Sequence, residues 1–179
     1  MSLTRKRKLS NIEHSSEQES TDFDSLFYQN WDRICEILYR LLGEWDEAQD
    51  IALETFMQLY QHPPKSKDNL NGWLYRVATN LGFNALRARK RRKFYENRAG
   101  LIILENNSPG QPEMNLEQLQ KQERVRHTLT KIKSRSAKLL ILRHSGLTYA
   151  EIATALKLSP GSVGTLLTRA EREFEKQYK

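Results

Sequence analysis

The stretch that most restricts the fold is residues 147–163, LTYAEIATALKLSPGSV, because it carries the start signals of two successive helices. Thr148 and Glu151 have the Thr-x-x-Glu spacing of a capping box, in which both side chains satisfy free amide groups of the first turn. Ser159 is a preferred N-cap residue, and Pro160 follows it at the first helical position, where a missing N–H costs nothing. The sequence therefore predicts two helices separated by a tight turn.

The two predicted helices each have one apolar side. The residues expected to face inward are Ile152, Ala153 and Leu156 in the first helix and Val163, Leu167, Ala170 and Phe174 in the second. The opposite side of the second helix carries Gly161, Ser162, Thr165, Leu166, Thr168 and Arg169. A helix presented in this way fits the major groove of DNA, although the same pattern also fits an ordinary helical hairpin.

The exposed side of this second helix carries little charge for a DNA-binding helix. Gly164 lies in its middle, where glycine costs about 1 kcal/mol relative to alanine but would permit close approach to the DNA backbone. Leu166 could contact a thymine methyl group. We therefore expect weak intrinsic affinity, which suits a DNA-binding helix carried by a larger assembly.

Composition favours a helical, basic protein. The 179 residues include only 8 glycines and 5 prolines, and the net charge of +7 suggests a polyanionic partner, either nucleic acid or an anionic membrane. The single cysteine, Cys35, excludes an internal disulfide and a cysteine-rich zinc site. No apolar run approaches the roughly 20 residues that span a bilayer, and the basic N-terminus lacks the apolar core of a signal peptide. We expect a cytoplasmic chain without membrane insertion.

The chain divides into segments of different composition. Residues 1–22 carry a basic cluster followed by a Ser/Glu/Gln-rich run, and we expect them to form a disordered tail. Residues 99–116 contain Asn-Asn, Pro and Gly and indicate a linker. Helical patterns occupy the two blocks on either side of this linker, residues 23–98 and 117–179.

Three helices with apolar stripes are predicted in the first block. The first ends at Gly43, the second ends before Pro63, and the third begins near Leu70. Their inward residues are expected to be Phe27, Trp31, Ile34, Leu38 and Leu41, then Ala48, Ile51, Ala52, Thr55, Phe56 and Leu59, then Trp73, Val77, Ala78 and Leu81. Three helices with short connections predict a compact bundle.

The third predicted helix has the residue types of a nucleic-acid surface. Arg76, Asn80, Asn84 and Arg87 recur along one polar side, and the run Arg87–Lys93, RARKRRK, holds six basic residues in seven. Such a run neutralises phosphates, and a nearby aromatic such as Tyr75 could stack on exposed bases. A solvated basic face is the alternative interpretation.

The second predicted helix has the opposite charge. Between Glu44 and Tyr60 there are five acidic residues and no Lys or Arg. The outward residues Asp50, Leu53, Glu54 and Gln58 mix acidic and apolar character, which suits docking onto a protein partner. A solvated acidic face fits the spacing equally well.

Three segments in this order resemble bacterial RNA polymerase sigma factors of the small, two-domain type called extracytoplasmic-function sigma factors. DEAQDIALETFMQLY resembles region 2.2, which binds the clamp coiled coil of the polymerase β′ subunit. NLNGWLYRVATNLGFNALRARKRR resembles regions 2.3 and 2.4, which melt and recognise the minus-ten element. SGLTYAEIATALKLSPGSVGTLLTRAERE resembles region 4, which recognises the minus-thirty-five element. The resemblance covers roughly residues 24–98 and 116–179.

The resemblance implies an all-α fold of two small helical domains joined by a flexible linker. Region 2, a three- or four-helix bundle, would occupy residues 23–98, and the helix-turn-helix region 4 would occupy residues 117–179. The implied function is to bind core RNA polymerase and direct it to promoters. The implied partners are the β′ clamp coiled coil, the β flap and promoter DNA, with an anti-sigma factor as an optional regulator. Neither catalysis nor a cofactor or metal is implied.

The resemblance also assigns roles to individual residues. The core-binding residues would be Asp50, Leu53, Glu54 and Gln58. The loop at 65–71 resembles the segment that captures a flipped minus-ten base, and the minus-ten residues would be Lys65, Lys67, Asn69, Trp73, Tyr75, Arg76, Asn80, Asn84, Arg87, Arg89, Lys90 and Arg91. The minus-thirty-five residues would be Tyr149, Ser159, Pro160, Gly161, Ser162, Thr165, Leu166, Thr168 and Arg169.

Four positions depart from the family pattern. Leu53 stands where the family usually has Gln, Asn84 where Asp is common, and Gly164 and Leu166 replace basic or polar residues. The segment IKSRSAKLL also replaces the Leu-Pro-acidic-Arg run that usually precedes region 4. These departures bear on which promoter bases are recognised, which the sequence does not specify.

Other classes of protein fit the sequence less well. A stand-alone helix-turn-helix regulator, the main alternative, would need its own dimer interface and a charged recognition helix. An enzyme would need a reactive cluster, whereas His14, His62, His127 and His144 are scattered and no glycine-rich phosphate loop is present. A purely protein-binding role is disfavoured by the two surfaces that suit DNA.

Overall fold

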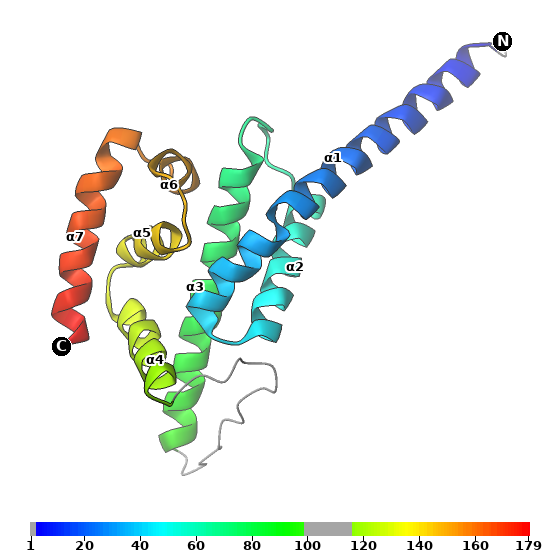
Figure 1. Cartoon of the computed structure of the whole chain (residues 1–179). Coiled ribbons are helices and arrows are strands. Elements are labelled where there is room, and N and C mark those ends of the chain that lie inside the picture. Colours follow the sequence, from blue (N-terminus) through cyan, green and yellow to red (C-terminus); the bar gives the residue numbers. More distant parts are fainter. Residues whose placement is uncertain (1–2, 99–115) are drawn as a thin grey trace. The chain divides into compact units, whose positions relative to one another are not determined.

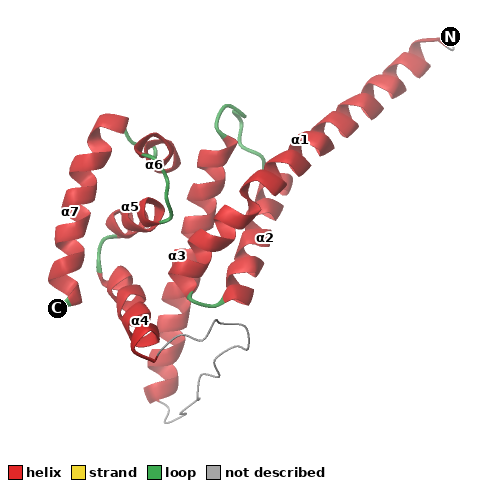
Figure 2. Cartoon of the chain, in the orientation of Figure 1, coloured by secondary structure: helices red, strands yellow, loops and turns green. Residues whose placement is uncertain are grey.

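The computed structural model describes the backbone of residues 3–98 and 116–179, and side chains from Phe23 onward except Lys93 and residues 96–98. In these ranges it contains seven helices and no strand (Figures 1 and 2). They are α1 (Leu3–Leu42), α2 (Trp45–Gln61), α3 (Leu70–Arg98), α4 (Leu116–Lys131), α5 (Ser134–His144), α6 (Tyr149–Leu156) and α7 (Pro160–Tyr178). The expected all-α fold is confirmed. The expected linker lies outside the described residues except for Leu116, which begins α4.

The chain divides into two compact units, residues 1–32 and 33–179. Within the first unit, the rings of Phe27 and Trp31 stack with centroids 4.9 Å apart, and Asn30 Nδ2 donates to the Leu26 carbonyl at 2.9 Å. The backbone of α1 is helical from Leu3, which differs from the disordered tail expected for residues 1–22. Helix propagation adds one backbone bond per residue fixed once a helix has nucleated, so helix can extend beyond its apolar stripe.

The second unit begins with the C-terminal part of α1, which packs among α2 and α3. Ile34, Leu38 and Leu41 are fully buried, as their spacing predicted. Gly82 of α3 permits close approach, because a Cβ there would lie 2.8 Å from the Cδ2 atoms of both Leu38 and Leu41. α1 ends as expected at Gly43, whose φ of +82° is the left-handed conformation that favours glycine.

The burial of α2 matches its predicted stripe, whereas the burial of α3 is broader. All six predicted inward residues of α2 are buried. In α3 only Ala78 of the predicted stripe is buried, and Trp73, Val77 and Leu81 are half-buried. The deeper positions include Leu74, Tyr75, Thr79, Phe83 and Leu86. The reason is that α3 packs against α2 on one side and against α4 and α6 on another, so that more than one stripe is covered (Figure 1).

Helices α5, α6 and α7 surround the core of the second block. Val163, Leu167 and Ala170 of α7 are buried as predicted, and Phe174 is half-buried and stacks on Tyr178. In α6, Ile152 and Ala153 are buried as predicted, but Ala155 is buried more deeply than Leu156. Leu156 ends this short helix, next to Lys157 in the left-handed conformation (φ 54°).

The predicted helix starts are present, with one difference. Thr148 and Glu151 form both hydrogen bonds of the capping box at the start of α6. Pro160 occupies the first turn of α7, and Ser159 holds the N-cap position without a side-chain cap bond. The Ser162 hydroxyl instead donates to the Ser159 carbonyl at 2.8 Å. The prediction that Ser159 caps α7 is therefore right in position and wrong in mechanism.

Candidate polymerase-binding and DNA-binding surfaces

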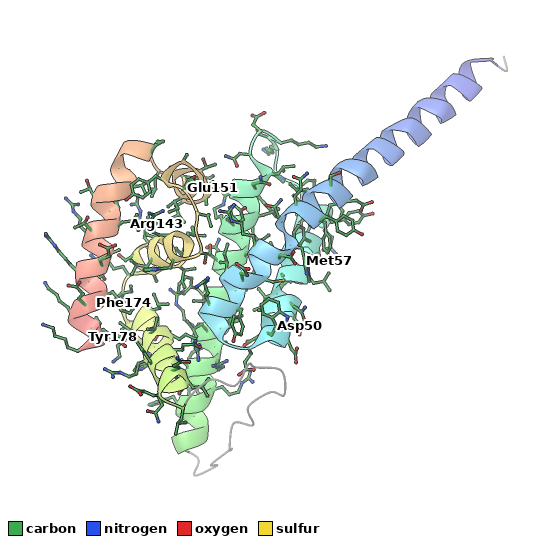
Figure 3. All side chains as sticks on the ribbon, in the orientation of Figure 1. Asp50, Met57, Arg143, Glu151, Phe174 and Tyr178 are labelled. Atoms are coloured by element: carbon green, nitrogen blue, oxygen red, sulfur yellow. The ribbon has the colours of Figure 1, made fainter. Side chains whose placement is uncertain are left out.

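The outward face of α2 combines carboxylates with exposed apolar side chains. Asp50 and Glu54 are exposed, and Leu53 between them retains 52% of its accessible surface. Gln58 is half-buried, and its amide donates to Glu54 Oε1 at 3.4 Å. Figure 3 shows Asp50 and Met57 extending from this helix. Since exposed large apolar groups gather at interaction sites, the face suits a protein partner.

Two residues of this face were missed by the sequence analysis. Met57 is 45% exposed and Tyr60 is 71% exposed, and they follow Leu53 at steps of four and three along α2. Their helical spacing from Leu53 was the available signal. The apolar part of the face therefore extends one turn beyond the residues predicted.

The polar side of α3 is partly covered. Asn84 is exposed, whereas Arg76, Asn80 and Arg87 are half-buried. Lys138 Nζ donates a hydrogen bond to Asn80 Oδ1. Tyr75 is only 2% exposed, so in this arrangement its ring is not available for stacking on a base.

The loop before α3 presents two exposed lysines and a helix cap. Lys65 and Lys67 are exposed, and Ser66 donates to Asp68 Oδ2 at 2.6 Å between them. Asn69 Oδ1 accepts from the Gly72 amide at 2.9 Å, so this side chain caps the first turn of α3. Its oxygen is occupied by that bond, which leaves the amide nitrogen as the group that could meet DNA.

The basic run lies along the second half of α3. Lys90, Arg91 and Arg92 are exposed, while Arg89 is half-buried and lies 3.6 Å from Glu47 Oε2. The side chain of Lys93 is outside the described residues. A basic, solvent-exposed stretch of helix is suited to phosphate contact.

Two exposed aromatic residues follow the basic run and were not singled out from the sequence. Phe94 is 61% exposed and Tyr95 is 66% exposed, and their rings meet edge to face at 5.7 Å. Their adjacency to six basic residues was the available signal, because bases stack on aromatic rings.

The outward face of α7 is open. Gly161, Thr165, Thr168 and Arg169 are exposed, as is Pro160 beside Ser159 at the helix start. Ser162 and Leu166 are half-buried. The structure thus brings the predicted minus-thirty-five residues of α7 together on one accessible side.

Tyr149 lies between α5 and the middle of α7. The Arg143 guanidinium carbon is 5.3 Å from the centroid of its ring, and a Cβ at Gly164 would lie 3.5 Å from its Cε2 atom. The glycine in α7 therefore faces Tyr149 at ordinary van der Waals distance.

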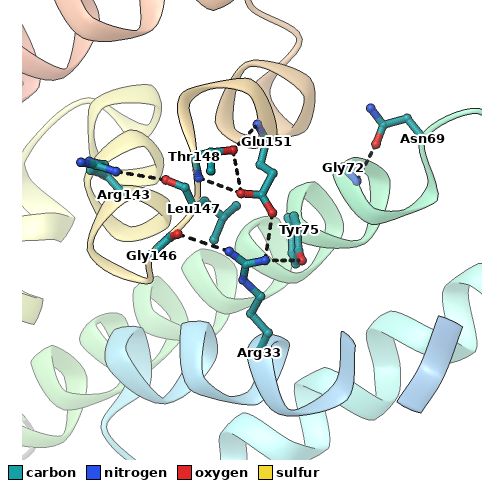
Figure 4. A network of polar contacts seen from close by, with 9 residues as sticks. All are labelled: Arg33, Asn69, Gly72, Tyr75, Arg143, Gly146, Leu147, Thr148 and Glu151. Atoms are coloured by element: carbon teal, nitrogen blue, oxygen red, sulfur yellow. Dashed lines mark hydrogen bonds and ion pairs between the residues drawn. The ribbon is translucent and has the colours of Figure 1, made fainter. Parts of the chain in front are cut away.

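Arg33 connects the end of α1 to the start of α6. Arg33 Nη1 donates to Glu151 Oε1 at 2.9 Å and lies 3.4 Å from the Tyr75 hydroxyl (Figure 4). Arg33 Nη2 donates to the Gly146 carbonyl at 3.3 Å. Burial raises the pKa of Tyr75, against the opposing effect of Arg33. Burial also tends to raise the pKa of Glu151, but hydrogen bonds from Thr148 and the charge of Arg33 hold it below its usual value.

Two further properties limit the chemistry available. Among the residues that the structure describes, no group of three or more His, Cys, Asp or Glu side chains could hold a metal ion. None of the helices in those ranges is long and apolar enough to cross a bilayer.

Comparison with known proteins agrees with these surfaces. Residues 26–92 match the family Sigma-70 region 2, and residues 122–174 match the family Sigma-70, region 4. The chain is 30% identical to RNA polymerase sigma factor YlaC of Bacillus subtilis over 86% of its own length and 90% of that protein's length. The chain belongs to the sigma-70 family of RNA polymerase sigma factors.

Other relatives place this sigma factor in the extracytoplasmic-function subfamily. It is 24% identical to ECF RNA polymerase sigma factor SigW of Bacillus subtilis over 99% of its length and 98% of that protein. It is 27% identical to RNA polymerase sigma-H factor of Pseudomonas aeruginosa over 97% of its length and 95% of that protein.

The fold agrees with that of a solved sigma factor. The structure of the sigma factor RpoE of Bartonella quintana, in complex with the anti-sigma factor NepR, matches with a TM-score of 0.51. The match covers 87% of this chain and 96% of that one at 19% identity, which supports the shared fold. The chain is thus an RNA polymerase sigma factor that directs transcription from promoters.

Proposed function

We propose that three separate surfaces of this sigma factor carry its function: α2 binds core polymerase, α3 binds the minus-ten element and α7 binds the minus-thirty-five element. The observation that carries this proposal is the separation of chemistry among the three helices. α2 presents carboxylates and apolar groups, α3 presents amides and a basic run, and α7 presents an open, weakly charged face.

The face of α2 has the properties of a protein interface. Leu53, Met57 and Tyr60 would provide desolvated apolar contact, because apolar and aromatic residues dominate interface energetics. Asp50 and Glu54 would supply charge complementarity to a basic partner. An acidic surface is repelled by DNA, so we assign this face to the polymerase β′ clamp coiled coil.

The surfaces of α3 and α7 divide the work on promoter DNA. Asn80 and Asn84 can form hydrogen bonds with base edges, while Lys90 and Arg91 neutralise phosphates. α7 would enter the major groove with its N-terminal residues nearest the bases. Each surface alone would bind weakly, and polymerase would strengthen both by fixing their separation.

We also infer that an anti-sigma factor regulates this chain, as the name of the solved Bartonella complex indicates for that protein. A groove supports the inference, because it is lined by side chains of α1, α4, α5 and α7. Val125, Leu129 and Phe174 provide apolar lining, and Glu36 and Glu171 lie at its charged parts. A partner helix with an apolar stripe and basic flanks would fit this groove.

The test of the α2 assignment is binding of the chain to purified core RNA polymerase, measured by fluorescence anisotropy. Asp50→Ala with Glu54→Ala should weaken binding at least about tenfold, or about 1.4 kcal/mol. The matched control is Glu171→Ala with Glu175→Ala, an exposed acidic pair at the same spacing on α7. Unchanged affinity of the α2 variant, with folding intact by circular dichroism, would remove this face from the interface.

A further inference from the structure

We propose that region 4 docks onto the DNA-binding side of region 2 in the free sigma factor, which masks the minus-ten surface and leaves the minus-thirty-five helix open. The proposal rests on the assignment of α3 to minus-ten DNA made above. It adds that the unbound chain holds itself in a closed state, in which its two DNA-binding surfaces are unequally available.

The central contact is a polar cluster around Arg33. The Arg33 guanidinium pairs with Glu151 of α6 at 2.9 Å, donates to the Gly146 carbonyl at 3.3 Å, and lies over the Tyr75 ring at 5.6 Å. Figure 4 shows these groups converging from α1, α3 and the turn that leads into α6. One side chain therefore joins region 2 to the helix-turn-helix of region 4.

Glu151 has a second role that couples this contact to the fold of region 4. Its Oε2 atom accepts from the Thr148 amide at 2.7 Å and from the Thr148 hydroxyl at 2.8 Å, while Oε1 accepts from Arg33. The same carboxylate thus caps α6 and pairs with region 2. The start of α6 is presented to Arg33 in the geometry that the capping box fixes.

Contacts on either side of the cluster extend the interface along α3. Gly72 permits close approach of α6, because a Cβ there would lie 2.7 Å from Thr154 Cγ2. Lys138 of α5 donates to Asn80 Oδ1. Lys90, further along α3, donates to the Thr130 hydroxyl of α4 at 3.2 Å. Region 4 therefore contacts α3 near its start, its middle and its basic run.

These contacts fall unequally on the two DNA-binding surfaces. On region 2, Tyr75 is buried and Asn80 donates or accepts within the interface, whereas Asn84 stays exposed. On region 4, the contacts come from α4, α5, α6 and the turn before α6, and the outward residues of α7 such as Thr165 and Arg169 remain exposed. The closed state therefore covers much of the minus-ten surface and spares the recognition helix.

The closed state is also too short to span a promoter. The two elements are about 25 base pairs apart, or about 85 Å at 3.4 Å per base pair. α6 packs against both α3 and α7, so the two surfaces are separated by about two helix diameters, on the order of 20 Å. Region 4 must leave region 2 before both elements can be bound, and an exposed ion pair is weak enough for binding to polymerase to break it.

The test is to open the closed state by removing positive charge. Arg33→Gln with Lys138→Gln deletes both cross-domain donors, so charge alone predicts weaker binding to DNA whereas unmasking predicts stronger binding. The probe is a fluorescent single-stranded DNA of mixed sequence. We expect the double variant to bind it about 3- to 10-fold more tightly than the unmodified chain, because affinity scales with the competent fraction. The matched control is Arg40→Gln with Lys131→Gln, which removes two exposed charges from the same helical blocks and should bind equally or more weakly.

The conformation is measured separately in the full chain, without DNA. Spin labels at Asp46→Cys in α2 and Lys176→Cys in α7 report the separation of the domains, since both sites are exposed and Cys35 is buried. The separation should be short and narrow in the unmodified chain and longer in the double variant. Conversely, Lys90→Cys with Thr130→Cys joined by a short thiol crosslinker should bind the DNA more weakly than its uncrosslinked form.

Two results would overturn the proposal. One is a label separation in the double variant equal to that of the unmodified chain. The other is a longer separation without tighter binding, which would show that region 4 does not mask the surface. Failure of the α3 assignment is distinguishable, because an isolated region 2 fragment, opened variant and unmodified chain would then all fail to bind single-stranded DNA even when the label separation changes.

Discussion

At the residue scale, the first turn of each helix in region 4 is stabilised differently. α6 starts with a complete capping box between Thr148 and Glu151. α7 starts with Ser159, whose side chain forms no cap bond, and with Pro160, whose ring fixes the backbone for helix. Side-chain capping thus carries more of the stability at the first helix than at the second.

Removing the two hydroxyls should therefore have unequal effects. Thr148→Ala is expected to lower the free energy of unfolding by about 1 kcal/mol. Ser159→Ala should lower it by less than about 0.5 kcal/mol, the lower end of the range for N-cap residues, since no bond is lost. Urea denaturation of both variants measures the difference. An equal or larger loss for Ser159→Ala would contradict the observed cap geometry.

Glu173 gives region 4 a pH dependence. Its carboxylate accepts from the Ser136 hydroxyl at 2.7 Å and from the Lys133 amide at 2.9 Å, and these bonds hold its pKa below the usual 4.5. A lowered folded-state pKa means that the carboxylate stabilises the fold fully above about pH 4.5. The stabilisation is lost as the pH falls through the lower, folded-state value.

Glu173→Gln should therefore be less stable than the unmodified chain at pH 7, and the difference should shrink as the pH falls from about 5 towards 3. Thermal unfolding at a series of pH values measures this. Glu171→Gln, an exposed residue one turn from Glu175 on the same helix, is the control and should show no such convergence. A constant difference for Glu173→Gln at all pH values would mean that the carboxylate charge is not responsible.

At the element scale, α7 contains a glycine whose surroundings are partly open. A methyl group at Gly164 would meet Tyr149 Cε2 at 3.5 Å, an ordinary contact. Gly164→Ala should therefore raise the free energy of unfolding by about 0.5–1 kcal/mol through helix propensity. If the glycine serves close approach to DNA, the same variant should bind minus-thirty-five DNA more weakly. A more stable variant with unchanged DNA affinity would leave the glycine without a role at the DNA.

How far sequence predicted each element depends on how many neighbours it has. The inward residues of α2 were all predicted, because the helix buries one stripe and exposes the rest. α3 was predicted in position but not in burial, since its second covered side depends on α6, far along the chain. The capping box was visible because its two residues are local. The pairing of Arg33 with Glu151 was not, because no pattern links positions so far apart.

The candidate surfaces show the same limit. The exposed face of α2 followed from periodicity, and only its extension to Met57 and Tyr60 was missed. The choice of Tyr75 as a stacking residue came from its neighbours in sequence, whereas the structure buries it beneath Arg33. Whether Tyr75 contacts DNA after the domains separate depends on tertiary rearrangement, which lies beyond any local pattern.

At the scale of the whole molecule, the separation of chemistry among α2, α3 and α7 explains why one small chain suits a bipartite promoter. An acidic, apolar face attaches to polymerase, and two surfaces that bind DNA weakly are delivered by it. The closed state of region 2 and region 4 extends this division, because DNA binding then depends on polymerase to open the chain.

The most direct test of this account is transcription in vitro with purified core polymerase, the full chain and a library of genomic DNA fragments, followed by sequencing of transcript 5′ ends. The account predicts that adding the chain concentrates the starts at a limited set of positions that share two upstream sequence elements, and that Asp50→Ala with Glu54→Ala reduces this effect. Starts identical to those of core polymerase alone, from a chain that binds duplex DNA by itself at physiological salt, would contradict it.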